Sequence, residues 1–317
     1  ALHGQPFPPG VQVAENLYAK GLVDAVVAPS GVAEVAARIL EVLCAPREPS
    51  QAAEPLTDDH VDAAPVAESI QRSRRPDRPG VRTLLKAVAQ DVTPLSGTGA
   101  GEMDPGVLLA LARFGTAPCV VLGQDGHRQR RQPLGPAGLR AARRGIRIAR
   151  ELDLPLVTVI DTGGAALSKE AEEGGLAGEI ARCLVDLVTL PAPTLCLLLG
   201  EGAGGGALAF LPTDRVVAAQ HAWLSPLPPE GASAILHRTT ERAVEVAERQ
   251  GVGTAALLSH GIVDRIIPEL PDAADEGEAF LRRVGTVLEA ELGALLRSEP
   301  AVRYGQRRRR YRRLGLA

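Results

Sequence analysis

A glycine-rich turn is the part of this sequence whose residue types and spacing best suit chemistry. The apolar run at residues 195–199 ends at Gly200, and residues 200–206 hold five glycines before a stretch of small helix formers. Glycine lets the backbone approach a ligand closely, and a helix start presents N–H groups that have no acceptor within the helix. Such groups bind an anion or the negative charge that develops in a transition state. The turn therefore indicates an oxyanion site built from backbone amides.

Three other interpretations of the turn are weaker. Gly200, Gly202 and Gly205 fit the dinucleotide fingerprint G-x-G-x-x-G, but residues 217–229 contain no Asp or Glu to hold a ribose hydroxyl. A phosphate-binding P-loop would need Lys followed by Ser or Thr where an Ala-Leu pair stands at residues 207–208. A tight packing turn between a strand and a helix remains the plainest alternative.

A second turn of the same kind follows another apolar run. Residues 156–160 are typical of a buried strand, and the sequence Asp-Thr-Gly-Gly-Ala at residues 161–165 comes directly after it. We expect further strands at residues 117–122, 195–199 and 215–219, and a helix at residues 138–152 whose five arginines form a solvated face. In an α/β domain of this kind, two strand-to-glycine turns are expected to form two walls of one pocket.

An internal repeat suggests the domain organisation. Gly-Leu-Val-Asp-Ala-Val-Val at residues 21–27 matches Gly-Ile-Val-Asp-Arg-Ile-Ile at residues 261–267. A proline corner precedes each copy (residues 6–10 and 226–231), an amphipathic helical pattern follows each (residues 32–43 and 279–295), and Asp24 and Asp264 are expected to pin a turn. We therefore predict the C-terminal remnant of one domain at residues 1–46, a linker at 47–65 and a second domain at 66–317. By the same logic roughly 175 residues of the first domain would precede the chain.

Composition limits the classes of function. The chain has 317 residues, a net charge of −3 and 3% aromatic residues, so bulk nucleic-acid binding is not expected. The four cysteines lack C-x-x-C spacing and the six histidines lack metal-ligand spacing, which predicts free thiols in a reducing cytoplasm and no metal site. No apolar run reaches 18 residues, so no membrane span is expected. The arginine-rich segment at residues 307–313 is interpreted as a solvated tail or a contact with another subunit.

Five segments, in order, resemble the alpha carboxyltransferase subunit of bacterial acetyl-CoA carboxylase. They are residues 68–79, which read Glu-Ser-Ile-Gln-Arg-Ser-Arg-Arg-Pro-Asp-Arg-Pro, and residues 154–162, 171–173, 200–209 and 229–236. Residues 4–27 resemble a late part of the beta subunit, including its Pro-Pro-Gly corner and Gly-Leu-Val-Asp. The chain is thus similar to a fused beta–alpha carboxyltransferase of the crotonase superfamily.

The resemblance implies a crotonase-like α/β fold, a spiral of repeated β-β-α units. It also implies transfer of the carboxyl group of carboxybiotin to the α-carbon of an acyl-CoA, with two oxyanion holes for the ureido oxygen and the thioester enolate oxygen. The residues that it implies as catalytic are Gly204, Gly205, Gly206, Gly163, Gly164 and Ala165. The residues that it implies as cofactor contacts are Gly200, Gly202, Gly204 and Gly205.

The family also implies partners. The sequence has no Ala/Val-Met-Lys-Met biotinylation motif, and Met103 is its single methionine, so biotin would arrive on a separate carrier and not be bound covalently. A biotin carboxylase would charge that carrier. The family places its site between a beta half and an alpha half of different subunits, which implies at least a homodimer. Acetyl-CoA as substrate would give malonyl-CoA for fatty acid biosynthesis.

The sequence departs from the family at several positions, which keeps two alternatives open. Gly163 replaces a proline, Gly174 replaces an arginine, and the segment 124–135 is shortened. One alternative is a crotonase-type acyl-CoA hydratase or isomerase, which needs a carboxylate base such as Glu172, Glu173 or Glu179. The other is a degenerate subunit that scaffolds a carboxylase complex without catalysis.

Overall fold

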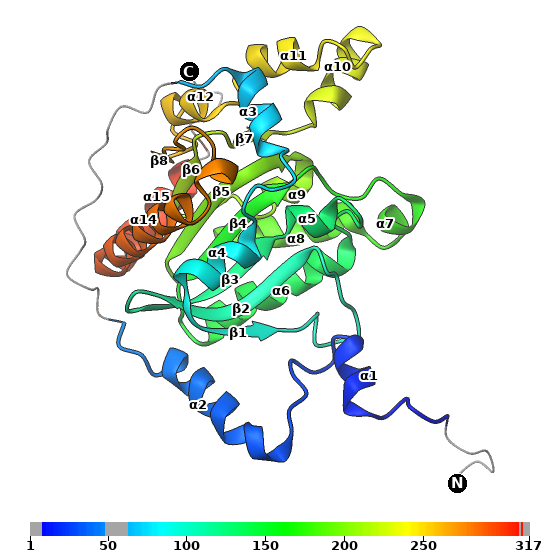
Figure 1. The fold of residues 1–317 in the computed structure, drawn as a ribbon, viewed down its shortest axis with the longest axis vertical. Coiled ribbons are helices and arrows are strands. Elements are labelled where there is room, and N and C mark those ends of the chain that lie inside the picture. The colour runs from blue at the N-terminus through cyan, green and yellow to red at the C-terminus, as the bar shows by residue number, and fades with distance from the viewer. Residues whose placement is uncertain (1–7, 48–62, 311, 313–317) are drawn as a thin grey trace.

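The computed structural model describes residues 8–47, 63–310 and 312, and its centre is a mixed β-sheet (Figure 1). The strands are β1 (Gln90–Leu95), β2 (Val107–Phe114), β3 (Ala117–Gln124), β4 (Leu156–Thr162), β5 (Thr194–Ala203), β6 (Arg215–Ala219), β7 (Trp223–Ser225) and β8 (Arg265–Ile267). The order is β1-β2-β3-β4-β5-β6-β8, and β7 pairs with β5. The pairs β1–β2 and β2–β3 are antiparallel, whereas all the others are parallel.

Helices cover both faces of the sheet because its strands are apolar on both faces. Leu109 and Leu122 are register partners, and both contact Gly145 of α6 (Pro136–Glu151). Gly123, the next residue of β3 after Leu122, lies on the opposite face of the sheet, against Val81 of α4 (Val81–Val88). This alternation is the two-residue period of a strand. Helix α8 (Leu176–Val188) packs on α6, and α14 (Glu278–Arg297) packs on α4, which makes a helix–sheet–helix sandwich.

The predicted strands and helices are confirmed, with one informative difference in β5. The apolar run does not stop at residue 199, because the strand continues through Gly200 and Gly202 to Ala203. Its first half pairs with β6, and its second half pairs with β7, where Glu201 faces Trp223. The glycine-rich segment is therefore half strand and half helix start, rather than one loop.

The internal repeat is visible as two similar corners. Helices α1 (Ala14–Ala19) and α12 (Thr254–Ser259) are separated along the chain by the same number of residues as the two repeated sequences. Each helix ends shortly before a glycine in the left-handed region, Gly21 (φ 68°) or Gly261 (φ 69°). Asp24 accepts hydrogen bonds from the Ser96 amide and from Arg144. Asp264 likewise accepts from the Val216 amide and from Arg310, so both aspartates pin a turn, as expected. Pro6 and Phe7 of the first proline corner lie outside the described residues.

The second copy of the repeat adds a strand to the sheet and the first does not. Residues 265–267 form β8, whereas residues 25–27 are not in a strand and leave Val26 and Val27 about two-fifths exposed. The N-terminal segment instead packs on the sheet through α2 (Val32–Leu43), which contacts β1, β2 and β3. The predicted linker falls mostly on residues 48–62, outside the described residues. The domain division therefore stays a prediction.

The C-terminal arginines correct one interpretation. Helix α15 (Pro300–Arg310) packs on its own domain, and Arg307 is 1% exposed. Its guanidinium donates to Asp214 and to three backbone carbonyls, those of residues 187, 190 and 192. The start of the predicted arginine tail is thus a buried anchor, since each N–H of a buried guanidinium needs an acceptor. Tyr311 and Arg313 lie outside the described residues.

The arginine face of α6 also differs from expectation. Arg140 pairs with Glu102 and Glu179, and Arg143 pairs with Glu179 and Asp186, so these side chains link α6 to its neighbours rather than face water alone. The remaining helices are η1 (Pro29–Gly31), α3 (Val66–Ser73), α5 (Gly126–Gln129), α7 (Lys169–Glu173), α9 (Gly204–Leu208), α10 (Pro229–His237), α11 (Ala243–Gln250) and α13 (Ala273–Glu276). None of the described helices is both long and apolar enough to span a membrane.

Candidate functional site

A pocket of about 410 Å³ opens where β4 and β5 end. We call it the turn pocket. Its lining comes from α5 and the segment after it, from the turn that follows β4, and from β5; the residues are Gly126, Gln129, Arg130, Pro133, Asp161, Thr162, Gly163, Gly164, Ala165, Leu167 and Glu201. Ligands of parallel α/β sheets bind outside the carboxyl ends of the strands, which is where this pocket lies.

The two glycine turns meet at this edge, as the sequence predicts. Strands β4 and β5 are neighbours, with Thr162 opposite Gly202. An ideal Cβ on Gly206 would lie 3.3 Å from the backbone nitrogen of Ala165, so the two turns are in contact. The Thr162 hydroxyl accepts a hydrogen bond from the Gly164 amide at 3.1 Å, and Gly164 has a φ of 124° that favours glycine. Backbone, rather than side chains, therefore forms this junction.

The glycines of the second turn divide into two groups. Gly204, Gly205 and Gly206 form the first turn of α9, where backbone N–H groups have no acceptor within the helix. Gly204 has a φ of 65°, which turns the chain from strand to helix. Gln124 donates a hydrogen bond to the Gly206 carbonyl at 2.7 Å and so ties α9 to the end of β3. These three glycines lie beside the turn pocket, while Gly163, Gly164 and Ala165 line it.

Gly200 and Gly202 lie inside β5 and are buried. A Cβ on Gly200 would lie 2.5 Å from the carboxylate of Asp161, and one on Gly202 would lie 2.8 Å from the Trp223 carbonyl. Close packing therefore accounts for glycine at both positions. Their assignment as cofactor contacts stays a prediction.

Asp161 is a half-buried acid at the pocket wall, between two glycines. Its carboxylate fills the space that a Cβ on Gly126 or Gly200 would need, and it accepts a 3.3 Å hydrogen bond from the Glu201 amide. Burial raises the pKa of Asp161 to about 6; the nearby Arg78 guanidinium opposes that shift, and the Glu201 carboxylate adds to it. Asp161 thus changes charge close to neutral pH.

Two arginines from the segment at residues 68–79 bind to β5, the strand that contributes Glu201 to the turn pocket. Arg74 pairs with Glu201 at 2.8 Å and with Glu230 at 2.5 Å, and its guanidinium lies 5.8 Å from the centre of the Trp223 ring. Arg78 is buried, donates two 2.7 Å hydrogen bonds to Glu269 and bonds to the carbonyl of residue 199 in β5. A buried bidentate pair of this kind fixes geometry strongly. This explains why an arginine-rich segment opens the domain.

Sequence reasoning missed the side chains that complete the turn pocket. Gln129 donates to the carbonyl of Gly106 and accepts from the Thr162 hydroxyl, which joins α5 to β4. Arg130 lines the pocket and donates to the Arg74 carbonyl at 2.8 Å. The available signal was the polar segment that follows the strand predicted at residues 117–122, since side chains just past a parallel strand gather at one end of the sheet.

The carboxylates named for a hydratase do not gather at the pocket. Glu172 and Glu173 are exposed on α7, and Glu179 is held by Arg140, Arg143 and Arg182. None of the three lines the turn pocket. Among the described residues, no group of His, Cys, Asp or Glu side chains is arranged to hold a metal ion; His3 and His60 lie outside that part of the chain.

Comparison with known proteins places these features in context. A family model described as acetyl co-enzyme A carboxylase carboxyltransferase-like matches residues 50–315. The chain is 53% identical, over 99% of its length, to the probable biotin-dependent acyl-coenzyme A carboxylase beta3 subunit of Mycobacterium tuberculosis, and covers 63% of that protein. It is 34% identical to the acetyl-coenzyme A carboxylase carboxyl transferase subunits beta/alpha of Salinispora tropica, over 99% of this chain and 59% of that one. The chain thus spans about three-fifths of these relatives.

Solved structures share the fold. The transcarboxylase 12S hexamer aligns with a TM-score of 0.66 at 18% identity, over 94% of this chain and 58% of that one. A single-chain, multi-domain long-chain acyl-CoA carboxylase aligns with a TM-score of 0.64 at 18% identity, over 88% of this chain and 28% of that one. These similarities confirm the predicted crotonase-like α/β fold.

Proposed function

The chain belongs to the acetyl-CoA carboxylase carboxyltransferase family, and we propose that it is the carboxyltransferase component of a biotin-dependent acyl-CoA carboxylase. The 53% identity with a mycobacterial relative of that description supports the proposal. The two turns at the carboxyl ends of β4 and β5 supply a matching site. Because the chain spans about three-fifths of those relatives, their activity comes to this chain as our proposal.

The contact between the two glycine turns is the observation that carries the proposal. Carboxyl transfer needs backbone donors that are already in place when negative charge develops on an oxygen. In our proposal the amides of Gly204, Gly205 and Gly206 stabilise the ureido oxygen of biotin. The turn at residues 163–165 forms the facing wall. A partly buried site strengthens such donors, because less water screens them.

The turn pocket suits a carrier-borne group. Its volume of about 410 Å³ falls within the range of small-molecule sites, roughly 300–1,000 Å³. Carboxybiotin, when bound, supplies the carboxyl group. The chain's own part is to orient the ring system between the two turns and to exclude water from them, with Asp161 and Gln129 holding the wall from beneath.

We further propose the partners that this chemistry requires. They are an acyl-CoA, a separate biotin carrier with its biotin carboxylase, and a second copy of the protein in at least a homodimer. Residues 1–46 would belong to a beta-like half and residues 66–317 to the alpha-like half. If acetyl-CoA is the substrate, the product is malonyl-CoA for fatty acid biosynthesis. The buried thiols of Cys119, Cys183 and Cys196 support a reducing compartment such as the cytoplasm.

A substitution at Gly163 gives the sharpest test. Gly163 is exposed at the pocket, and a Cβ there meets no atom within 4 Å, so a large side chain fits without displacing the fold. Gly205 is less suitable, since its Cβ would press on Ile180 of α8 at 2.8 Å. The measurement is carboxyl transfer by the full-length protein, with its biotinylated carrier, across acetyl-, propionyl- and longer acyl-CoAs. A matched control is Val185→Trp, at a 61% exposed position on α8 outside the pocket.

We expect turnover in the unmodified protein and in Val185→Trp, and a loss of roughly tenfold or more in Gly163→Trp, because the bulky ring blocks the turn pocket. Equal turnover in both variants would remove the pocket from the mechanism. No turnover by a folded protein with an active biotin carboxylase would instead favour a non-catalytic, scaffolding subunit.

A further inference from the structure

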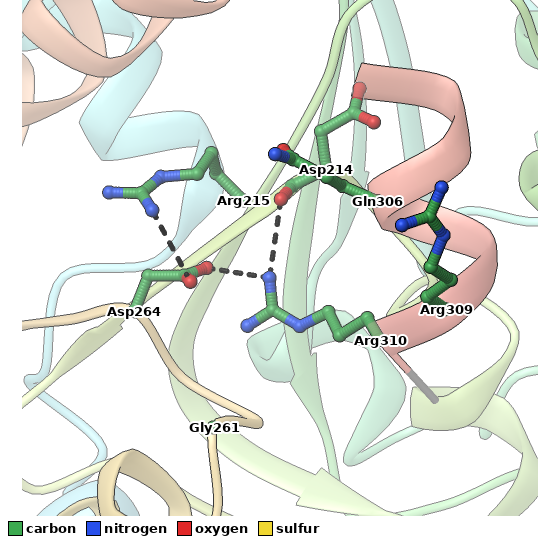
Figure 2. Close-up of a pocket in the computed structure, with 7 residues that line it drawn as sticks. All are labelled: Asp214, Arg215, Gly261, Asp264, Gln306, Arg309 and Arg310. Atoms are coloured by element: carbon green, nitrogen blue, oxygen red, sulfur yellow. Dashed lines mark hydrogen bonds and ion pairs between the residues drawn. The ribbon is translucent and has the colours of Figure 1, made fainter. Parts of the chain in front are cut away.

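A second pocket, of about 430 Å³, is drawn in Figure 2. It lies at the end of the parallel strands opposite to the turn pocket. We call it the arginine pocket; its lining residues are Asp214, Arg215, Gly261, Asp264, Gln306, Arg309 and Arg310. Asp214 directly precedes β6, and Asp264 directly precedes β8, so this pocket sits at the amino ends of the strands. The turn pocket sits at the carboxyl ends of β4 and β5. The arginine pocket therefore has no part in the proposed carboxyl transfer.

The two aspartates of the arginine pocket are already saturated with donors. Asp214 accepts from the Thr194 amide and hydroxyl and from Arg307, at 2.6–2.9 Å. Asp264 accepts from the Val216 amide and from Arg310, both at 2.7 Å, and pairs with Arg215 at 3.4 Å. Neither carboxylate is left to attract a cation, so the pocket is not a metal site.

Positive charge remains after this pairing. The charged lining residues and their direct ion-pair partners comprise five arginines and three carboxylates: Arg215, Arg303, Arg307, Arg309 and Arg310 against Asp214, Asp264 and Glu291. Arg309 has no ion-pair partner among the described residues, and Figure 2 draws no interaction from its guanidinium to the other lining residues. Two unbalanced positive charges around a concave surface attract an anion of charge about −2.

The donor geometry favours phosphate chemistry. A guanidinium is a planar fork that binds phosphate or carboxylate oxygens through paired hydrogen bonds. Arg309 and Gln306 project from α15, and Arg215 approaches from β6, 39% exposed, so donors reach the pocket from two elements. The guanidinium of Arg310 donates to the Asp264 carboxylate and to the Asp214 carbonyl, and so holds these two parts of the pocket wall together. We propose that the arginine pocket binds a small phosphate-bearing dianion or polyanion, with Arg309 as its principal ligand.

Titration calorimetry with inorganic pyrophosphate tests this proposal, at constant ionic strength and on the full chain. We expect a Kd on the order of 1 mM or tighter, and a weakening of about tenfold or more in Arg309→Ala, because a charge-assisted hydrogen bond is lost. Arg308→Ala is the matched control. It removes the same charge from the next residue of α15, which is exposed and lies near Tyr304 outside the pocket. We expect it to change the Kd by less than about twofold.

Three results would overturn the proposal. The first is that pyrophosphate does not bind the unmodified protein at a concentration 10-fold above the expected Kd. The second is that Arg309→Ala and Arg308→Ala weaken pyrophosphate binding equally. The third is that succinate binds as tightly as pyrophosphate. The second would show attraction by the general surface charge, and the third would show a dianion site without preference for phosphate. Thermal unfolding of each variant without ligand checks folding, and since Arg309 is exposed we expect no change there.

Discussion

The carboxylate of Asp161 occupies the space where Gly200 would carry a side chain, since a Cβ on Gly200 would lie 2.5 Å from Oδ1. On the other side, a Cβ on Gly126 would lie 2.5 Å from Oδ2. Two glycines from different elements thus form a socket for one acid. The socket fixes the end of β4 against β5, which is the junction from which both glycine turns start.

Gly200→Ala is expected to destabilise the fold. The added methyl group must displace the Asp161 carboxylate, which lies beside Arg78, and overpacking of this kind costs roughly 1–3 kcal/mol. The free energy of unfolding in urea measures the effect. Gly31→Ala is the control, because its Cβ meets no atom within 4 Å; its unfolding free energy is expected to stay within about 0.5 kcal/mol. Equal values for the two variants would refute the socket.

Asp161 is expected to lower the free energy of unfolding as the pH rises, which is the opposite of the effect of an aspartate whose pKa is lowered by folding. Burial raises its folded-state pKa from 3.8 to about 6, so the folded state binds more protons than the unfolded state between those values. The contribution of Asp161 to stability is therefore present at low pH and falls as the pH rises through about 6. Compared with Asp161→Asn, the unmodified protein should lose up to roughly 3 kcal/mol of unfolding free energy between pH 4 and pH 7.

Asp77→Asn supplies a control of opposite sign for that measurement. Asp77 is exposed, and its hydrogen bonds with Arg75 lower its pKa, so the stability it contributes is lost as the pH falls. Urea unfolding should therefore show the Asp161→Asn difference changing between pH 4 and pH 7, whereas the Asp77→Asn difference stays nearly constant there and changes in the opposite direction only below about pH 4. A flat difference for Asp161→Asn would mean that Asp161 titrates in the folded state as it does in the unfolded chain.

Arg307→Ala is expected to cost about 3–5 kcal/mol, because it leaves Asp214 without its main buried partner. Arg308→Ala, at the next and exposed position, should change stability by less than about 0.5 kcal/mol. Urea unfolding of both variants decides between a buried anchor and a solvated tail. Similar small effects in both would restore the tail interpretation.

Thiol labelling should distinguish the four cysteines. Cys44 is exposed, whereas Cys119, Cys183 and Cys196 are buried, and burial raises the pKa of Cys196 to about 12. A chromogenic disulfide reagent at pH 8 should react quickly with one thiol per chain and with all four after unfolding in urea. Rapid reaction of a second thiol in the native protein would show that the fold opens locally around one of the buried cysteines.

Much of the site could be predicted from sequence because it is made of backbone. The turns at residues 161–165 and 200–206 carry their own signal, since runs of glycine after an apolar strand are rare unless the backbone must come close to something. Their adjacency followed from a general rule of parallel sheets, and the contact between Gly206 and Ala165 agrees with it.

The errors have a common physical origin. The strand β5 runs on to Ala203 because β7 offers a second partner, and the sequence does not reveal which strand pairs with which. Arg307 is buried because Asp214, 93 residues away, lies beneath α15. Long charged side chains are usually solvated, so only the position of a distant carboxylate could show the exception.

The sequence by itself determined the family, the α/β alternation, the two turns and the repeated corners at Gly21 and Gly261, because these depend on local patterns of apolar residues and glycine. The tertiary structure decided the rest. It alone showed that Gly200 serves Asp161, that Arg74 and Arg78 brace β5 from a distant segment, and that α15 closes a second pocket. Those relationships join residues that are far apart in the chain. Only the folded packing brings them close enough to contact, hydrogen-bond or pair with one another.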